Sequence, residues 1–140
     1  MSPAEALSSY QMGEEILKDS SRLWKGYLFE LYVQNLLLKF GISFIGNSRC
    51  FDTWKRQTNK GYDIKVKVGE GSWLQVECKF TLKKIYPSWI RRDWLSRDCD
   101  IIVCNDPSKL SEQDRDLLQS KGIKLLTPSQ FILYVLNLIL

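Results

Sequence analysis

The chain has 140 residues, of which 44% are hydrophobic and five are tryptophan, and its formal net charge is +4. This length and apolar fraction suit one folded domain over residues 1–140, with a polar lead-in at residues 1–20, rather than a disordered tail. The chain contains no histidine, which excludes Ser-His and Cys-His triads, histidine metal ligands and histidine general bases. Any catalysis must therefore use carboxylates, lysine, tyrosine or a hard metal ion.

The predicted elements begin with a helix over residues 22–40, RLWKGYLFELYVQNLLLKF, which Gly41 ends. The segments ISFIG (42–46) and CFDTW (50–54) alternate weakly and predict one bent strand or two short ones. YDIKVKV and WLQVECKF alternate with period two on either side of GEGS, a pattern that predicts an antiparallel hairpin.

The second half of the chain alternates helices and strands. Pro87 begins a second predicted helix, PSWIRRDWLSR. DIIVCN and IKLLT are short apolar strands typical of a buried sheet, and SEQDRDLLQSKG between them has the Ser cap and early acids of a helix. With PSQFILYVLNLIL as a closing helix, the order predicts an α/β fold: helix, three-strand antiparallel meander, helix, strand, then helix, strand, helix, with a mixed central sheet flanked by helices.

Two features bear on the cellular setting. The four cysteines have no Cys-x-x-Cys spacing, so we expect reduced, mostly buried thiols rather than a zinc site. The N-terminal segment lacks the apolar core of an export signal, and the apolar tail FILYVLNLIL is about half of what a bilayer crossing needs. We therefore expect a soluble cytoplasmic protein with no membrane partner.

The positive charge is concentrated in the middle of the chain. Between Trp54 and Arg97 there are eleven Lys or Arg against four Asp or Glu, a local charge of +7, so the remainder carries −3. This distribution suggests a surface that binds a polyanion.

Three polar residues of the hairpin are candidates for a site. If the apolar residues of both strands meet one core, Asp63, Glu77 and Lys79 must lie on the opposite face. Asp63 and Glu77 share that face only if the loop has an odd number of residues, three or five, because an even loop without a bulge would separate them. Antiparallel strands with one wet face alternate in this way routinely, so the hairpin alone favours a solvated face over a site.

Glu30 changes that balance. A turn of about 100° per residue places it nearly opposite the polar side of the first helix, facing the protein. A glutamate is almost never fully buried without a partner, because desolvating its charge costs several kcal/mol. It could pair with a lysine or arginine, or share a cation with Asp63 and Glu77, and the residues alone leave these two interpretations level.

Together these residues resemble the PD-(D/E)XK nuclease superfamily, which has the restriction-endonuclease-like fold. The match consists of Glu30 after KGYLF, Asp63 in GYDIKV, and VECK with Glu77 and Lys79. The helix–meander–helix–strand order is similar to that family's core, and the small size and spacing look closest to archaeal Holliday-junction resolvases and related small nucleases.

The resemblance covers roughly residues 24–104. Tyr62 stands where the motif has a proline, and Asp52 is the alternative to Asp63. What the resemblance implies is a Mg²⁺- or Mn²⁺-dependent endonuclease that hydrolyses DNA, with junctions or other branched DNA as the expected substrate. The alternatives are a nuclease-fold protein that binds DNA without cutting it, and an RNA-binding or protein-interaction module on an unrelated α/β sheet.

The resemblance also implies roles for individual residues, with one or two ions per site and no small-molecule cofactor. The ligands of the ion are Asp63, Glu77 and the backbone carbonyl of Cys78, since Mg²⁺ prefers oxygen. Glu30 would support a second ion or orient a water. Lys79 would position or deprotonate the attacking water, and Gln75, on the same face, would touch water or substrate. The ion would polarise the scissile phosphate.

Basic residues beside aromatic ones predict where nucleic acid binds. In WKRQTNKG and KFTLKKIYPSWIRRDWLSR, the expected phosphate contacts are Lys55, Arg56, Lys60, Lys83, Lys84, Arg91 and Arg92. Trp89 and Trp94 could stack on bases, but we favour the core for both. The closing helix is apolar nearly all round, so it is either wholly buried or covers a partner, and a homodimer with two sites would suit cutting two strands.

Overall fold

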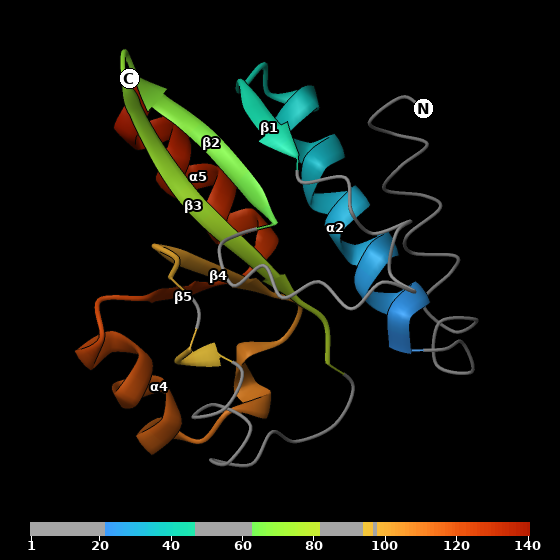
Figure 1. The fold of residues 1–140 in the computed structure, drawn as a ribbon, viewed down its shortest axis with the longest axis vertical. Helices are drawn as coiled ribbons and strands as arrows, with labels where there is room; N and C mark the ends of the chain where they lie inside the picture. The colour runs from blue at the N-terminus through green and yellow to red at the C-terminus, as the bar shows by residue number, and fades with distance from the viewer. Residues whose placement is uncertain (1–21, 47–62, 82–93, 97) are drawn as a thin grey trace.

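The structure of this chain, a computed structural model, describes residues 22–46, 63–81, 94–96 and 98–140. Three α-helices, one short 3-10 helix and five strands lie in this described part (Figure 1). In chain order they are α2 (Arg22–Lys39), β1 (Phe44–Gly46), β2 (Ile64–Gly69), β3 (Ser72–Lys79), β4 (Ile101–Cys104), η3 (Pro107–Lys109), α4 (Glu112–Ser120), β5 (Lys124–Leu126) and α5 (Pro128–Ile139).

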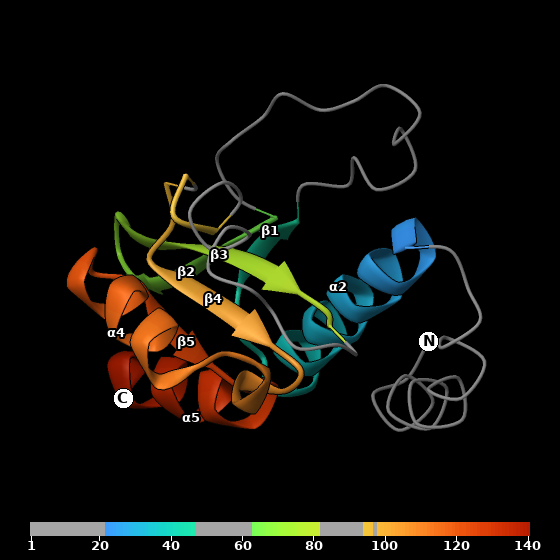
Figure 2. The same cartoon turned by 90° about the horizontal axis from the view of Figure 1, so that it is seen from below.

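The strands form one mixed sheet in the order β1-β2-β3-β4-β5. The first three pair antiparallel as a meander, whereas β3 with β4 and β4 with β5 are parallel. Figure 2 shows β3 and β4 side by side, with their arrowheads pointing the same way. The expected α/β class and mixed sheet flanked by helices are confirmed.

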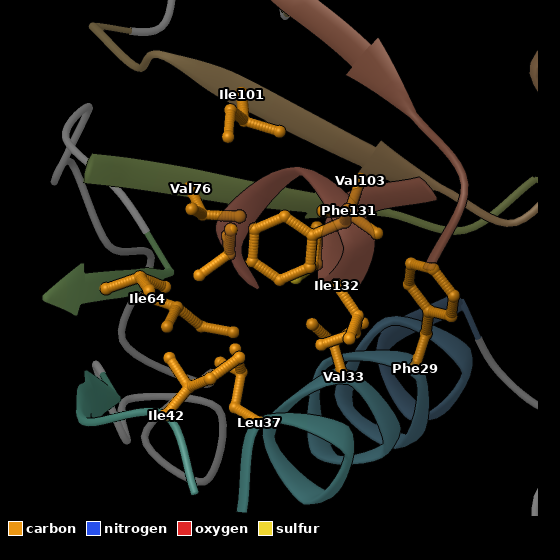
Figure 3. Close-up of a cluster of buried hydrophobic side chains, with 13 residues drawn as sticks. Phe29, Val33, Leu37, Ile42, Ile64, Val76, Ile101, Val103, Phe131 and Ile132 are labelled. Carbon is orange, nitrogen blue, oxygen red and sulfur yellow. The ribbon is translucent and has the colours of Figure 1, made fainter. Parts of the chain in front are cut away.

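Helices pack on both faces of this sheet. α2 and α5 bury Phe29, Val33 and Phe131 against one face, together with Val76 and the other inward residues of the hairpin (Figure 3). On the opposite face a second cluster joins α4 and its flanks to β4, and its buried members are Trp94, Ile102, Cys104, Leu110, Leu118 and Ile123. All four residues of β4 are therefore buried, as its unbroken apolar sequence predicted.

The helix ends follow the sequence signals. Gly41 takes a φ of +68°, which L residues rarely adopt, and the Ile42 N–H behind it donates to the Leu37 carbonyl at 3.0 Å. Ser111 caps α4 by accepting the Asp114 N–H at 3.1 Å. Thr127 forms a capping box at the start of α5. The third and the closing predicted helices are thus confirmed.

The hairpin loop differs from the expectation. β2 and β3 are separated by two residues, Glu70 and Gly71, rather than by three or five. The pairing Lys67↔Trp73 changes to Gly69↔Ser72 across an irregularity at Val68. The bulge adds one unpaired residue to the two-residue turn, which has the same effect on the register as a three-residue loop. The apolar residues of both strands therefore still lie on one face, and Asp63 and Glu77 lie on the other.

Some predicted features lie outside the described residues. The strand expected over residues 50–54 does, as does almost all of the second predicted helix, of which only Trp94–Ser96 are described. Trp94 is 3% exposed, in agreement with the core role expected for it. Among the described helices, none has the length and apolar character needed to span a membrane.

Candidate active site

Asp63 is fixed against β3 at the point where β2 begins. Its N–H donates to the Val76 carbonyl at 2.9 Å, and its Oδ2 accepts the Cys78 N–H at 2.9 Å. The carboxylate thus occupies the place that a backbone carbonyl would take if β2 continued, and it ends the ladder with a charged acceptor. Asp63 is therefore held on the strand that carries Glu77 and Lys79.

Glu77 lies next to this bond. The register Ile64↔Val76 and Lys65↔Gln75, carried one residue further, places Asp63 opposite Glu77. On its other side Glu77 pairs with Ile102, so its side chain lies on the face of the second cluster, away from α2 and α5. It is 5% exposed. A carboxylate at such depth is retained only with compensating partners.

Lys79 lies on the same face two residues later, paired with Cys104, and is half-buried. Cys78, between the two, turns its side chain to the opposite face and packs it in the main core. Because the N–H and C=O of one strand residue point to the same side, the Cys78 carbonyl faces the side of β3 where Asp63 lies.

Two further polar side chains, from the two ends of β4, hold β3 and the residue Thr81 that follows it. Asp100 Oδ2 accepts the Gln75 N–H at 2.8 Å, and the Asp100 N–H donates to the Gln75 carbonyl at 2.8 Å. Asn105 accepts the Thr81 N–H at 2.8 Å and donates Nδ2 to the Thr81 carbonyl at 2.7 Å. Both were missed from the sequence, although they directly flank the apolar run IIVC, where Asx side chains often bond to backbone.

Glu30 reaches the same end of the sheet from α2. It is 5% exposed, so the expectation that it faces the protein is confirmed. Gln34, one turn later, donates Nε2 to Glu30 Oε1 at 3.3 Å. The Gln34 amide also packs against Gly46 at the end of β1, where an added Cβ would stand 2.7 Å from Nε2. The preceding Phe29 packs on Phe80, with ring centroids 5.6 Å apart. Glu30 is thereby set between the ends of β1 and β3.

The four candidates gather at one end of the sheet but do not form a complete metal cage. Glu30 comes from a helix on the main-core face, whereas Glu77 and Lys79 project from the other face. In residues 22–46, 63–81, 94–96 and 98–140, no group of three or more His, Cys, Asp or Glu is placed to hold a metal ion. The structure joins Asp63 to the strand of Glu77, and it does not bring the three acids into a single ligand group.

The predicted nucleic-acid contacts all lie outside the described residues: Lys55, Arg56, Lys60, Lys83, Lys84, Arg91 and Arg92. The same holds for Tyr62 and the alternative acid Asp52. Gln75 is described and half-buried, on the same face as Glu77. Comparisons with protein-family models, with curated proteins and with solved structures find no match to this chain.

Proposed function

We propose that this protein is a divalent-metal-dependent nuclease of the PD-(D/E)XK type that hydrolyses phosphodiester bonds in DNA. The observation that carries the proposal is the hydrogen bond from the Cys78 N–H to Asp63, which fixes a carboxylate on the strand of Glu77 and Lys79. An aspartate at the start of one strand, beside a Glu-x-Lys on the next, is what the family resemblance implies. A restriction-endonuclease-like core belongs to the same proposal.

The donor set suits Mg²⁺ or Mn²⁺. Mg²⁺ is usually held by one or two carboxylates with waters and substrate phosphates, so Asp63 and Glu77 with the Cys78 carbonyl are a sufficient set without a third acid. An ionised carboxylate has about four lone-pair sites, so the bond from Cys78 leaves Asp63 able to accept other partners. When bound, such an ion polarises the scissile phosphate and acidifies water.

The protein's own groups would then orient the reaction. Lys79 lies on the face of Glu77, where its ammonium can hold the attacking water or, when neutral, take its proton. Glu30, steadied by Gln34, orients a water or supports a second ion from the α2 side. Gln75 contacts water or substrate. Because Asp63 holds the backbone at Cys78 and Asn105 holds it at Thr81, just beyond β3, this end of the strand is positioned before substrate arrives.

A second candidate is a nuclease-fold protein that binds DNA without cutting it. The observation that favours it is the similarity between Asp63 and Asp100: each directly precedes a strand, and each accepts a backbone N–H of β3. Since Asp100 does this with no site attached, Asp63 can be explained as a strand cap alone. In that case the acids serve only the structure.

Cleavage assays separate the two candidates. Plasmid and a four-way junction are incubated with the protein in Mg²⁺, Mn²⁺ or EDTA, beside Glu77→Gln and Asp63→Asn. We expect metal-dependent cleavage that falls by at least about 100-fold in both variants and is unchanged in Asp100→Asn, the matched cap control. Cleavage that survives Glu77→Gln refutes this site. Binding without cleavage in any metal supports the second candidate, and no affinity for DNA refutes both.

A homodimer is part of the proposal. α5 buries Phe131, Ile132 and Val135, yet Leu133 is 63% exposed and Leu138 is 45% exposed. The closing helix is thus partly buried and still presents apolar side chains that a second copy could cover. Light scattering coupled to size-exclusion chromatography measures the mass directly, and a monomer at micromolar concentration contradicts this part.

A further inference from the structure

The outer face of the β2–β3 hairpin carries a combination of side chains of which the candidate site uses only Gln75. Lys67 lies opposite Trp73, and Lys65 lies opposite Gln75. Lys65 also pairs with Ile45 on β1, so the face extends across three strands. These five residues, Ile45, Lys65, Lys67, Trp73 and Gln75, are here termed the hairpin platform.

Three residues of the hairpin platform are exposed, Ile45, Lys67 and Trp73, and the other two, Lys65 and Gln75, are half-buried. The described helices that contact the hairpin, α2 and α5, pack on its other face, and Figure 1 shows α5 behind β2 and β3. Ile45 is 53% exposed and Trp73 is 37% exposed, whereas Trp94 is 3% exposed in the second cluster. Trp73 therefore does not serve the core in the way that Trp94 does.

The chemistry of the platform fits one kind of partner. Lys65 and Lys67 are two residues apart on one strand, so their backbone positions are about 6.6 Å apart and both side chains extend from the same face. An exposed indole beside them provides a flat surface on which a base can stack, and Ile45 adds apolar area. Sheet surfaces that combine aromatic stacking with cationic phosphate contacts are typical of proteins that bind single-stranded nucleic acid.

We propose that the hairpin platform binds single-stranded DNA, with Trp73 stacking on a base and Lys65 and Lys67 contacting phosphates. This proposal rests on the proposed function, which gives DNA as the substrate, and it adds that the protein binds the DNA in single-stranded form. Because Gln75 and Glu77 are successive residues of one face of β3, a strand on the platform leads directly to the candidate site. The bases of double-stranded DNA are already stacked on one another, so they cannot stack on Trp73 in the same way.

The simpler explanation is a cross-strand pair in which the Trp73 ring lies over the methylene groups of Lys67 and stabilises the hairpin. That explanation predicts a change in stability when Trp73 is removed, and no change in DNA affinity. The two explanations therefore differ in what a binding measurement shows.

The test is fluorescence anisotropy of the full chain with a labelled oligo(dT) of about 15 nucleotides, in EDTA so that cleavage cannot occur. Trp73→Ala is expected to weaken binding by about 5- to 100-fold, and Trp73→Phe to restore most of it, since one base stack is lost and then regained. The double variant Lys65→Gln, Lys67→Gln is expected to reduce the slope of log affinity against log salt by about 1.4, or about 0.7 per phosphate.

The matched control is the exposed pair at the end of α2. Lys39 Nζ lies 5.7 Å from the centroid of the Phe40 ring, and Phe40 is 46% exposed. Phe40→Ala and Lys39→Gln remove an aromatic and a cation of the same kind away from the platform, and they should leave oligo(dT) affinity unchanged. Circular dichroism at the assay temperature checks that each variant is folded.

The outcomes separate this inference from the proposed function. Wild-type affinity in folded Trp73→Ala, equal weakening in Phe40→Ala, or an equal loss of duplex and single-strand affinity in Trp73→Ala overturns the platform. If the wild type cleaves DNA while Trp73→Ala binds and cleaves normally, the platform fails and the nuclease stands. If the wild type binds oligo(dT) through Trp73 but cleaves nothing in any metal, the platform stands and the nuclease fails.

Discussion

Removing the side chain of Asp63 and removing only its charge should have different consequences. Asp63→Ala takes away the acceptor of the Cys78 N–H, a part-buried bond of 2.9 Å to a charged group. Bonds of that kind contribute about 1.5–3 kcal/mol, so at about 4 °C per kcal/mol the melting temperature should fall by about 6–12 °C. Asp63→Asn keeps an amide oxygen in the same place. Because a neutral bond is about half as strong, and a negative charge beside Glu77 is removed, we expect a loss of about 1 kcal/mol or less.

The assays are thermal melting and urea unfolding, both in EDTA so that bound metal does not contribute, with Asp100 as the internal comparison. Asp100 makes the equivalent bond to Gln75 at 2.8 Å in an exposed setting, so Asp100→Ala should lose only about 0.5–1.5 kcal/mol. Asp63→Asn should remain folded and fail to cleave DNA, whereas Asp100→Asn should remain folded and cleave DNA like the wild type. The reasoning is refuted if Asp63→Asn is as unstable as Asp63→Ala, or if it retains wild-type cleavage.

Three further predictions concern other parts of the structure. Gly46→Ala places a Cβ 2.7 Å from Gln34 Nε2 and should displace that flexible amide, which costs about 1 kcal/mol of stability or less. Because the displaced amide no longer holds Glu30, this variant should reduce cleavage as much as Gln34→Ala does, and the double variant should show no further loss; additive losses contradict this. Asp114 is fully buried, and within the described part of the chain neither of its carboxylate oxygens has a hydrogen-bond partner. Asp114→Asn should therefore stabilise the protein by about 1–2 kcal/mol in urea unfolding, because the desolvation relieved exceeds the lost helix-dipole attraction of about 0.3–1 kcal/mol; a destabilised variant contradicts this. Burial raises the pKa of Cys104 to about 11, so at pH 8 iodoacetamide should label this thiol only after unfolding, while half-buried Cys99 reacts in the native protein, as peptide mapping by mass spectrometry would show. This pKa is above the value of about 8.5 expected in the unfolded chain. The contribution of Cys104 to stability is therefore fully present below about pH 8.5 and is lost as the pH rises toward 11.

The elements that the sequence predicts well are those with a local cause. The end of α2 at Gly41 and the start of α4 at Ser111 depend on backbone conformation and on one side-chain bond within a turn, which the residue types themselves indicate. The alternation in β2 likewise follows from one buried face, since Ile64 and Val66 are buried whereas Lys65 and Lys67 between and beyond them are not. β4 was recognisable because a strand buried on both faces needs an unbroken apolar run.

The features that the sequence did not predict depend on contacts between distant segments. A hairpin with this alternation can close through an odd loop or through a two-residue loop with a bulge, and it has the bulge at Val68. The sequence period is the same in both cases, so it does not predict which one packs better. Asp100 bonds to the backbone of Gln75 in β3, 25 residues away, and Asn105 bonds to the backbone of Thr81, just after β3 and 24 residues away. Asp114 was read as an acid favoured by the helix dipole, but the same helical face carries Leu118 into the second cluster and buries the carboxylate with it.

The candidate site was predicted in part for the same reason. That Asp63 and Glu77 share a face follows from the alternation of both strands about one core, although the bulge at Val68 that makes this possible was not predicted. The burial of Glu30 follows from the helix period. Whether those carboxylates share an ion depends on how α2 is set against the end of the sheet, a tertiary distance that no local pattern encodes. The described residues accordingly show the expected faces without a three-acid group.

A crystal structure of the full chain soaked with Mn²⁺, with anomalous diffraction to locate the metal, tests the shared role of these side chains most directly. We predict a manganese peak within coordination distance of the Asp63 and Glu77 carboxylates and the Cys78 carbonyl oxygen. The account is contradicted if manganese binds only at other positions and Glu77 is paired with a lysine or an arginine.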